Sequence, residues 1–142
     1  MTGALFVDTG GWVAVQIPND RWHAQAAAVL REAISGGVPL LTTNHVVGET
    51  YSLLVRAHGR PAAWKFLDGI ARSSRLERLH VDEPTEGEAV ELLRKYKDQP
   101  FSFVDGVSFA VMRRRRIRLA LAFDRHFAAA GYLRVPLDSE LP

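Results

Sequence analysis

Four acidic residues of this chain lie where the sequence predicts strand ends or helices. Asp8 follows the apolar run 4–7, and Asp124 follows the run 119–123. Asp105 begins a segment with apolar residues at helical spacing, and Glu49 lies within another such segment. Carboxylates that share a small space need a cation or captured protons, because unit charges about 4 Å apart repel by about 4 kcal/mol even at an effective dielectric near 20.

The type of ligand indicates the type of ion. Carboxylate oxygens without cysteine or clustered histidine favour the hard ions Mg²⁺ or Mn²⁺. Beside a basic surface, such an ion indicates phosphoryl transfer, in which it stabilises charge on the scissile phosphate. The residues alone leave a phosphatase, a nuclease and an acid-pocket signalling domain open.

Each acid also has an ordinary structural explanation. Asp8 fits a helix N-cap, and Asp124 fits the cap of a helix over 125–130. Ser102 and Asp105 have the spacing of a capping box. Glu49 fits a surface glutamate at a helix edge. The case for a functional site therefore depends on whether the four side chains meet.

The predicted elements bring them to one edge. Strands and helices alternate along the chain, which predicts a mostly parallel sheet with helices on both faces. In such a sheet, ligands bind in the crevice beyond the carboxyl ends of the strands. The predicted strands are 4–7, 39–43, 76–82, 119–123 and 132–135. Five helices are predicted over 22–35, 45–58, 83–97, 103–115 and 125–130, and two more are predicted to begin at residues 12 and 60.

Length and composition limit the class of protein. The 142 residues fit one domain, and 47% hydrophobic with 24% charged residues is typical of a soluble globular protein. No apolar run approaches a membrane span and the N-terminus lacks a signal-peptide pattern, so we expect a cytoplasmic protein without a membrane partner. The chain has no cysteine, which excludes disulfides and thiolate sites, and its five histidines lack ligand spacing, so zinc is not expected.

The charge favours a polyanionic partner. The formal net charge is +2, and 15 of the 18 basic residues are arginine, whose planar fork suits phosphate. If four of the 16 acidic residues were committed to a metal, the balance of the rest would be +6. That balance suits a partner such as nucleic acid.

Four segments, taken together, resemble a known family. They are FVDTG at 6–10, LTTNHVVGETYSLL at 41–54, SFVDGVSFAVMRRR at 102–115 and ALAFDRHF at 120–127. They are similar to the acidic motifs of PIN-domain ribonucleases, specifically the VapC-type toxins of bacterial toxin–antitoxin pairs. The resemblance implies a single PIN-like domain over 1–142, a three-layer α/β/α sandwich around a central mostly parallel sheet, and an endoribonuclease that uses Mg²⁺ or Mn²⁺.

The resemblance also implies roles for individual residues. Asp8, Glu49, Asp105 and Asp124 correspond to the acidic quartet of the family, and Ser102 to its small hydroxyl residue near the third acid. We expect Asp8 and Asp105 to bind the metal most directly, and Asp124 to complete the metal site or hold water. Glu49 is expected to position or activate the attacking water. Hydrolysis in this family leaves a 5′-phosphate and a 3′-hydroxyl.

One local departure from the family concerns the third acid. Many members carry Thr and Ala around it, where this chain has Val104 and Gly106. The hydroxyl role then depends more heavily on Ser102. Thr9 corresponds to the hydroxyl residue that follows the first acid.

The basic run has two interpretations. It consists of Arg113, Arg114, Arg115 and Arg116. A cation cluster at a helix C-terminus complements the helix dipole. Because the run lies between two proposed metal ligands in sequence, contact with the RNA backbone is the other interpretation. We expect His126 to be a surface or capping residue rather than a general base.

Partners follow from the same resemblance. VapC-like toxins are held by a small antitoxin and commonly form homodimers. We expect Trp12, Ile17 and Trp22 to be core residues; exposed, they would instead form an apolar groove for a partner helix.

Three other functions remain open. They are a solitary RNA-processing nuclease, a DNA nuclease, and a catalytically silent acidic-pocket binding domain. A receiver-like pocket would need a late lysine, but no lysine follows Lys97.

Overall fold

A parallel sheet forms the centre of the molecule. The computed structural model describes residues 3–136, and within them the sheet has five strands in the order β3-β2-β1-β4-β5. All four neighbouring pairs are parallel, and β5 is an edge strand as predicted. The strands are β1 (Leu5–Val7), β2 (Leu40–Thr43), β3 (Leu76–Leu79), β4 (Leu119–Leu121) and β5 (Leu133–Val135).

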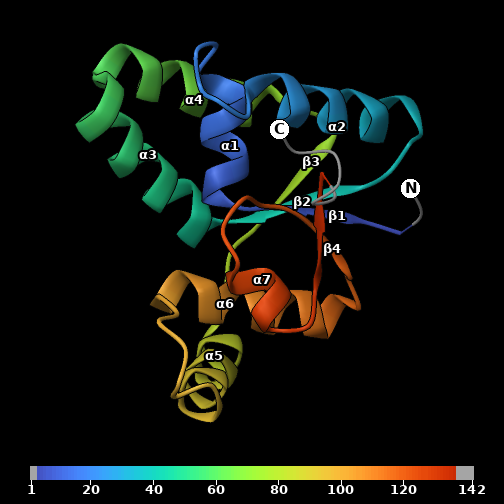
Figure 1. Cartoon of the computed structure of the whole chain (residues 1–142), viewed down its shortest axis with the longest axis vertical. Helices are drawn as coiled ribbons and strands as arrows, with labels where there is room; N and C mark the ends of the chain where they lie inside the picture. The colour runs from blue at the N-terminus through green and yellow to red at the C-terminus, as the bar shows by residue number, and fades with distance from the viewer. Residues whose placement is uncertain (1–2, 137–142) are drawn as a thin grey trace.

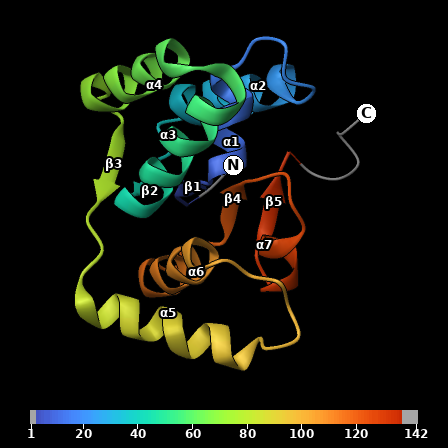
Figure 2. The same cartoon turned by 90° about the vertical axis from the view of Figure 1, so that its left-hand side faces the viewer.

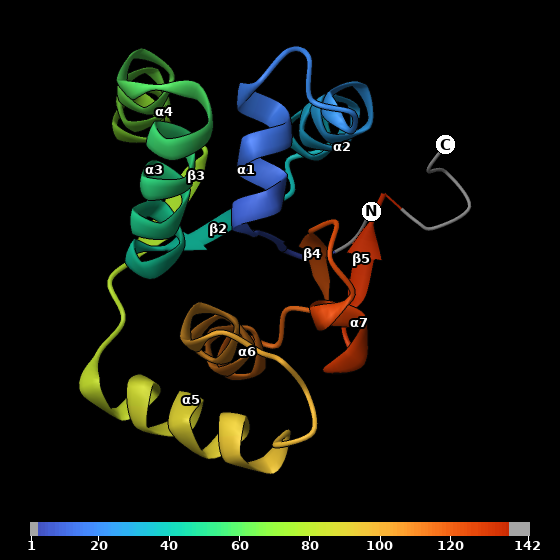
Figure 3. The ribbon, with the colours of Figure 1, turned by 60° about the vertical axis from the view of Figure 1, so that its left-hand side comes forward.

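Helices cover both faces of the sheet. Figures 1 and 3 show α1 to α4 on one face and α5 with α6 on the other. Figure 2 shows the same three layers after a quarter turn, with α7 beside β5. The predicted three-layer α/β/α class is confirmed. The helices are α1 (Thr9–Gln16), α2 (His23–Ser35), α3 (Asn44–His58), α4 (Arg60–Arg72), α5 (Glu83–Lys95), α6 (Phe103–Arg115) and α7 (His126–Ala129).

The central strands are buried because both of their faces are covered. Every residue of β1 and β2 is buried, which is the pattern that parallel strands between helix layers show. Helix α6 is also almost wholly buried from Asp105 to Met112. On its core side, Phe109 packs edge-on against Phe127 with ring centroids 5.0 Å apart. This contact fixes α6 relative to α7, and both helices carry side chains of the site described below.

Several predicted elements are shorter in the structure. The strand predicted over 76–82 ends at Leu79, because the Val81 amide donates to the Asn44 side chain at 3.0 Å instead of continuing the ladder. The strand predicted over 119–123 ends at Leu121. The helix predicted over 83–97 ends at Lys95, and the one over 125–130 is limited to α7.

A glycine lets α1 approach β4. A Cβ atom at Gly11 would lie 2.5 Å from the carbonyl oxygen of Leu121 and 2.9 Å from its Cγ. Real contacts of this kind are not tolerated, so only glycine permits this packing. The approach places the start of α1 beside the end of β4.

The three expected core residues differ in burial. Trp12 and Ile17 are buried, each with 7% of its surface exposed, as predicted. Trp22 is partly buried: it packs against the core cluster, and its ring stacks on Phe123.

No helix within residues 3–136 is both long enough and apolar enough to cross a membrane.

Candidate active site

Two acids stand at the ends of neighbouring strands. Asp8 directly follows β1, and its amide donates to the carbonyl of Leu121 at the end of β4, at 3.1 Å. Asp124 lies three residues after Leu121, the last residue of β4. Asp8 occupies the N-cap position of α1 but makes no side-chain capping bond, so its carboxylate is not used as a cap. Parallel pairing of β1 with β4 thus brings both carboxylates to one edge.

The third acid is held by the predicted capping box. The Asp105 amide donates to Ser102 Oγ at 3.1 Å, and the Ser102 amide donates to Asp105 Oδ2 at 3.0 Å. The same Oδ2 lies 2.7 Å from Nδ1 of His126. Two donors therefore occupy Oδ2, and within residues 3–136 no protein group bonds Oδ1 of Asp105, which leaves this oxygen available to a ligand.

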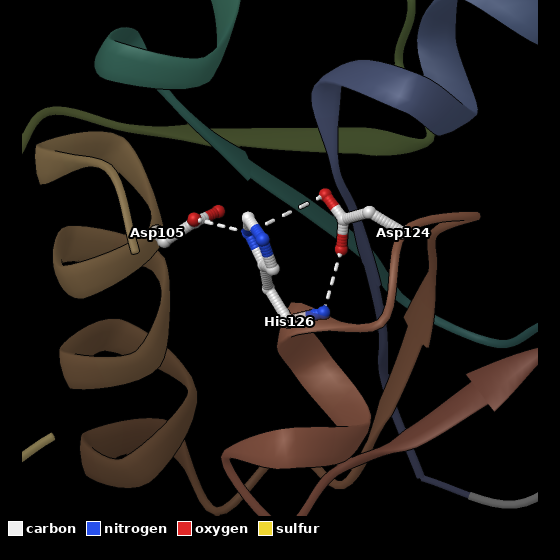
Figure 4. A group of neighbouring side chains, drawn as sticks. All are labelled: Asp105, Asp124 and His126. Carbon is white, nitrogen blue, oxygen red and sulfur yellow. Dashed lines mark hydrogen bonds and ion pairs between the residues drawn. The ribbon is translucent and has the colours of Figure 1, made fainter. Parts of the chain in front are cut away.

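His126 is a site residue that sequence reasoning did not identify. Its ring lies between Asp105 on α6 and Asp124 on the loop after β4 (Figure 4), with Nδ1 3.9 Å from Asp124 Oδ2. Its amide donates to Asp124 Oδ1 at 3.0 Å. The Phe101 ring packs edge-on against the His126 ring, with the two ring centroids 5.4 Å apart. The expectation of a surface or capping residue is therefore wrong for its side chain, which is 30% exposed and bonded within the site.

The signal for His126 in the sequence was weak. Its spacing from Asp124 allows the aspartate side chain to accept from the histidine amide two residues later, a local turn that many Asp-containing loops form. Nothing in that spacing indicates that the ring points toward α6, since α6 lies more than ten residues earlier in the chain. Tertiary packing alone reveals the contact.

The fourth acid is linked to the first strand end through a hydroxyl. Thr9 Oγ1 donates to Oε1 of Glu49 at 2.6 Å. Glu49 is partly buried on α3, and Thr9 directly follows Asp8. The bond joins helices α1 and α3 and gives the Glu49 carboxylate a fixed position. The alternative of a surface glutamate without a partner is thereby excluded.

The electrostatics show that the other three carboxylates act on Asp8. The pKa of Asp8 is raised well above its ordinary value, chiefly by burial and next by the negative charge of Asp124. The charges of Asp105 and Glu49 raise it further, while the Thr9 amide opposes the shift. These charges act on a buried residue, since Asp8 is 4% exposed. A shared catalytic role of the four acids stays a prediction.

An arginine from the edge strand holds the loop that carries Asp124. Arg134 Nη1 donates to the backbone carbonyls of Phe123 at 3.0 Å and of Asp124 at 2.7 Å. Burial raises the pKa of Asp124, while the His126 amide, the His126 charge and the Arg134 charge act in the opposite direction. Arg134 was not identified from the sequence, where an isolated arginine in a short edge strand gives no signal.

Comparison with known proteins identifies the family. The model of the PIN domain family matches residues 5–132. The chain belongs to the PIN domain family. This PIN domain is 40% identical over 132 residues to the 23S rRNA-specific endonuclease VapC20 of Mycobacterium tuberculosis. The aligned region covers 92% of this chain and 97% of VapC20. It is 28% identical over 127 residues to a VapC ribonuclease of Archaeoglobus fulgidus, covering 88% and 80% of the two chains. The predicted resemblance to VapC-type ribonucleases is confirmed.

Solved structures give the same result. The crystal structure of M. tuberculosis VapC20, described as a sarcin–ricin loop cleaving toxin, superposes on this PIN domain with a TM-score of 0.81. The two chains are 37% identical in that comparison, which covers 92% of this chain and 97% of the other. FitAcB from Neisseria gonorrhoeae has a TM-score of 0.65 at 17% identity, covering 92% and 95%, and supports the fold alone.

The residues at this edge fit a divalent cation. Ligand atoms of Asp105, Asp124 and His126 all lie within 4.8 Å of one another. Two carboxylates and an imidazole are a donor set that Mn²⁺ and other first-row divalent ions accept, and Mg²⁺ binds the carboxylates. The uncompensated charge around Asp8 is a second reason for a cation here. The charges of Asp124 and Asp105 act on Asp8, and direct ligation by Asp8 stays a prediction.

The basic run lies at the other end of α6. Asp105 is in the first turn of this helix and the arginines are in its last turn, about 15 Å away at 1.5 Å per residue. Arg114 pairs with Glu88 at 2.9 Å, and Arg115 pairs with Glu77 at 2.6 Å. Proximity in sequence to two metal ligands therefore does not place the run at the site, because a helix separates its two ends in space. An RNA-backbone role for residues 113–116 stays a prediction. Because Arg114 and Arg115 pair with glutamates, Arg113 and Arg116 would make the contacts with RNA phosphates.

Proposed function

We propose that this protein is an endoribonuclease that hydrolyses RNA phosphodiester bonds with Mg²⁺ or Mn²⁺, as the toxin of a toxin–antitoxin pair. The observation that carries the proposal is the group of Asp105, Asp124 and His126, whose ligand atoms lie within 4.8 Å of one another at the strand end that also carries buried Asp8. Such a cluster is stable in its ionised form when a cation neutralises it. The relatives, a 23S rRNA-specific endonuclease and a VapC ribonuclease, indicate the substrate class.

The side chains would divide the chemistry among them. Asp105, Asp124 and His126, with Asp8 beside them, would hold the cation, which supplies positive charge to the scissile phosphate. Ser102 and His126 fix Oδ2 of Asp105 and thereby direct Oδ1 toward the ligand.

The remaining acid would activate the nucleophile. The Thr9 hydroxyl holds Oε1 of Glu49, so the carboxylate has one defined orientation from which to accept a proton of the attacking water. The water oxygen bonds to phosphorus, the bond from phosphorus to the 3′-oxygen breaks, and that oxygen takes a proton. The products are a 5′-phosphate and a 3′-hydroxyl. A 2′,3′-cyclic phosphate would exclude this route.

The partners are part of the same proposal. We expect a small antitoxin that covers the acidic edge with a basic side chain, and a homodimer of this chain. Co-expression with the product of a neighbouring small open reading frame, followed by co-purification and loss of RNA cleavage, would support the toxin role. A nuclease that cleaves RNA but has no such inhibitor would instead be a solitary RNA-processing enzyme.

The deciding experiment compares cleavage of ribosomal RNA, total RNA and DNA by purified protein with Mg²⁺, Mn²⁺ or EDTA. We expect discrete RNA fragments that require the metal and disappear in Asp8→Asn. Asp68→Asn, an exposed aspartate on α4, is the matched control and should cleave like the wild type. Folded protein that leaves all RNAs intact with both metals would refute the proposal and favour a silent binding domain.

A further inference from the structure

A three-layer stack of side chains lies beside the acidic site. The rings of Trp22 and Phe123 are stacked with centroids 5.5 Å apart and planes 2° from parallel. The guanidinium carbon of Arg21 lies 4.1 Å from the centre of the Trp22 ring. Trp22 and Phe123 are partly buried and Arg21 is exposed. The exposed member of this group is therefore the Arg21 cation.

Its position relative to the site is set by the backbone. Phe123 immediately precedes Asp124, so their Cα atoms are about 3.8 Å apart. The Phe123 carbonyl accepts from Arg134 at 3.0 Å, which fixes the strand-end loop. On the other side, the Trp22 amide donates to Asp20 Oδ1 at 2.8 Å, which fixes the loop between α1 and α2. Both halves of the stack are therefore held in place next to one ligand of the proposed metal.

Packing explains only part of this arrangement. Contact between Trp22 and Phe123 closes the gap between two loops, which any pair of apolar side chains would do. It does not explain Arg21, which has no carboxylate within salt-bridge distance among residues 3–136. An uncompensated arginine plane on an aromatic ring, beside a cluster of carboxylates, has the features of a surface for a negatively charged ligand with flat rings.

We infer that Arg21, Trp22 and Phe123 form a platform on which an unpaired base of the RNA stacks next to the cleaved phosphate. Bases splayed out of single-stranded RNA stack on aromatic rings and on arginine planes, and the arginine charge also attracts the phosphate backbone. A base within a duplex is already stacked on both faces. The platform therefore selects a loop, bulge or flipped nucleotide at the cut. This inference rests on the proposed function and specifies the form of its substrate.

The test measures binding and cleavage separately. Binding of a fluorescein-labelled short single-stranded RNA, and of the same RNA in a duplex, is measured by anisotropy with Asp8→Asn protein and Mg²⁺. Arg21→Ala and Trp22→Ala are added singly. The matched controls are Arg72→Ala at the end of α4 and Trp64→Ala, which is 54% exposed on the same helix.

We expect each platform variant to weaken single-stranded RNA binding by about 5- to 150-fold, the range for loss of one base stack. Duplex binding and both control variants should change less than twofold. Arg21→Lys keeps the positive charge but lacks the planar guanidinium group. It should therefore lose most of the contribution that Arg21 makes to single-stranded RNA binding. Because Arg21 is exposed, its variants test the inference even if Trp22→Ala lowers the melting temperature.

Two outcomes would overturn the inference. Unchanged single-stranded RNA binding in Arg21→Ala and Trp22→Ala would assign this surface to another partner, such as a protein. Equal losses for single-stranded and duplex RNA would show that Arg21 acts through charge alone. In the same experiments, metal-dependent cleavage by protein with Asp8 intact tests the proposed function independently. If metal-dependent cleavage is observed but the platform variants bind RNA normally, the proposed function stands and only the platform inference fails.

Discussion

Asp8→Asn should make the metal-free protein more stable and the metal-bound protein less stable than the wild type. Asp8 is 4% exposed, and burial together with three neighbouring carboxylates raises its pKa. Because the folded-state pKa lies above the ordinary value of 3.8, ionisation of Asp8 opposes folding. Wild-type stability therefore falls as the pH rises from that ordinary value through the folded-state pKa. The advantage of the Asn variant should be absent in acid and largest at high pH.

The size of the effect follows from the chain length. A single stabilising substitution commonly contributes about 0.5–2 kcal/mol. At about 2.1 cal/mol/K per residue, a chain of 142 residues has an unfolding entropy near 0.3 kcal/mol/K, so 1 kcal/mol shifts the melting temperature by about 3 °C. In EDTA at pH 8, Asp8→Asn should melt about 2–7 °C above the wild type. Mn²⁺ at about 100 times its Kd adds about 2.7 kcal/mol to the wild type, or about 9 °C, and reverses the order.

Melting curves by circular dichroism or scanning fluorimetry would measure both shifts. The series needs EDTA and Mn²⁺ at pH 5, 6.5 and 8, with Asp68→Asn as the exposed control that should follow the wild type throughout. The reasoning is refuted if Asp8→Asn melts below the wild type in EDTA at pH 8. It is refuted equally if Mn²⁺ raises the melting temperature of the variant as much as that of the wild type.

Substitutions at three further positions test the supports of the site. Gly11→Ala should destabilise the protein by about 1–3 kcal/mol, because the added Cβ meets the Leu121 backbone at 2.5 Å; a denaturation midpoint equal to the wild type would contradict this packing. Ser102→Ala should lose about 1 kcal/mol with its capping bond to Asp105, whereas Ser102→Thr should retain most of the stability. His126→Asn can place an amide near the position of Nδ1, so it should keep more RNA cleavage and Mn²⁺ affinity than His126→Gln or His126→Ala, as measured by single-turnover kinetics and calorimetry. Equal losses in all three histidine variants would mean that the bond to Asp105 is not what matters.

Much of the site was predictable because it depends on local order. The short apolar run before Asp8 and the capping-box spacing of Ser102 and Asp105 are properties of a few adjacent residues. Strand alternation with helices then predicts a parallel sheet, and a parallel sheet places its carboxyl ends together. The electrostatic coupling of Asp8 to the other three acids is the result of that arrangement.

Other features were wrong or absent because they depend on contacts between distant segments. His126 reaches Asp105 only because α7 packs beside α6, and Arg134 reaches the Asp124 loop only because β5 pairs with β4. Arg114 and Arg115 lie between two proposed metal ligands in sequence, but α6 separates them from Asp105 in space and each pairs with an acid. Their RNA-backbone role stays a prediction.

The sequence by itself determined the order of strands and helices and the capping box of Ser102 and Asp105, since these depend on periodicity and short spacing. The tertiary structure alone decided which oxygen of Asp105 is free, that His126 joins the site, and that Trp22 stacks on Phe123 beside Asp124. The physical reason is that side-chain direction across a helix–sheet interface is set by packing between segments far apart in the chain. Neighbouring residues do not encode it.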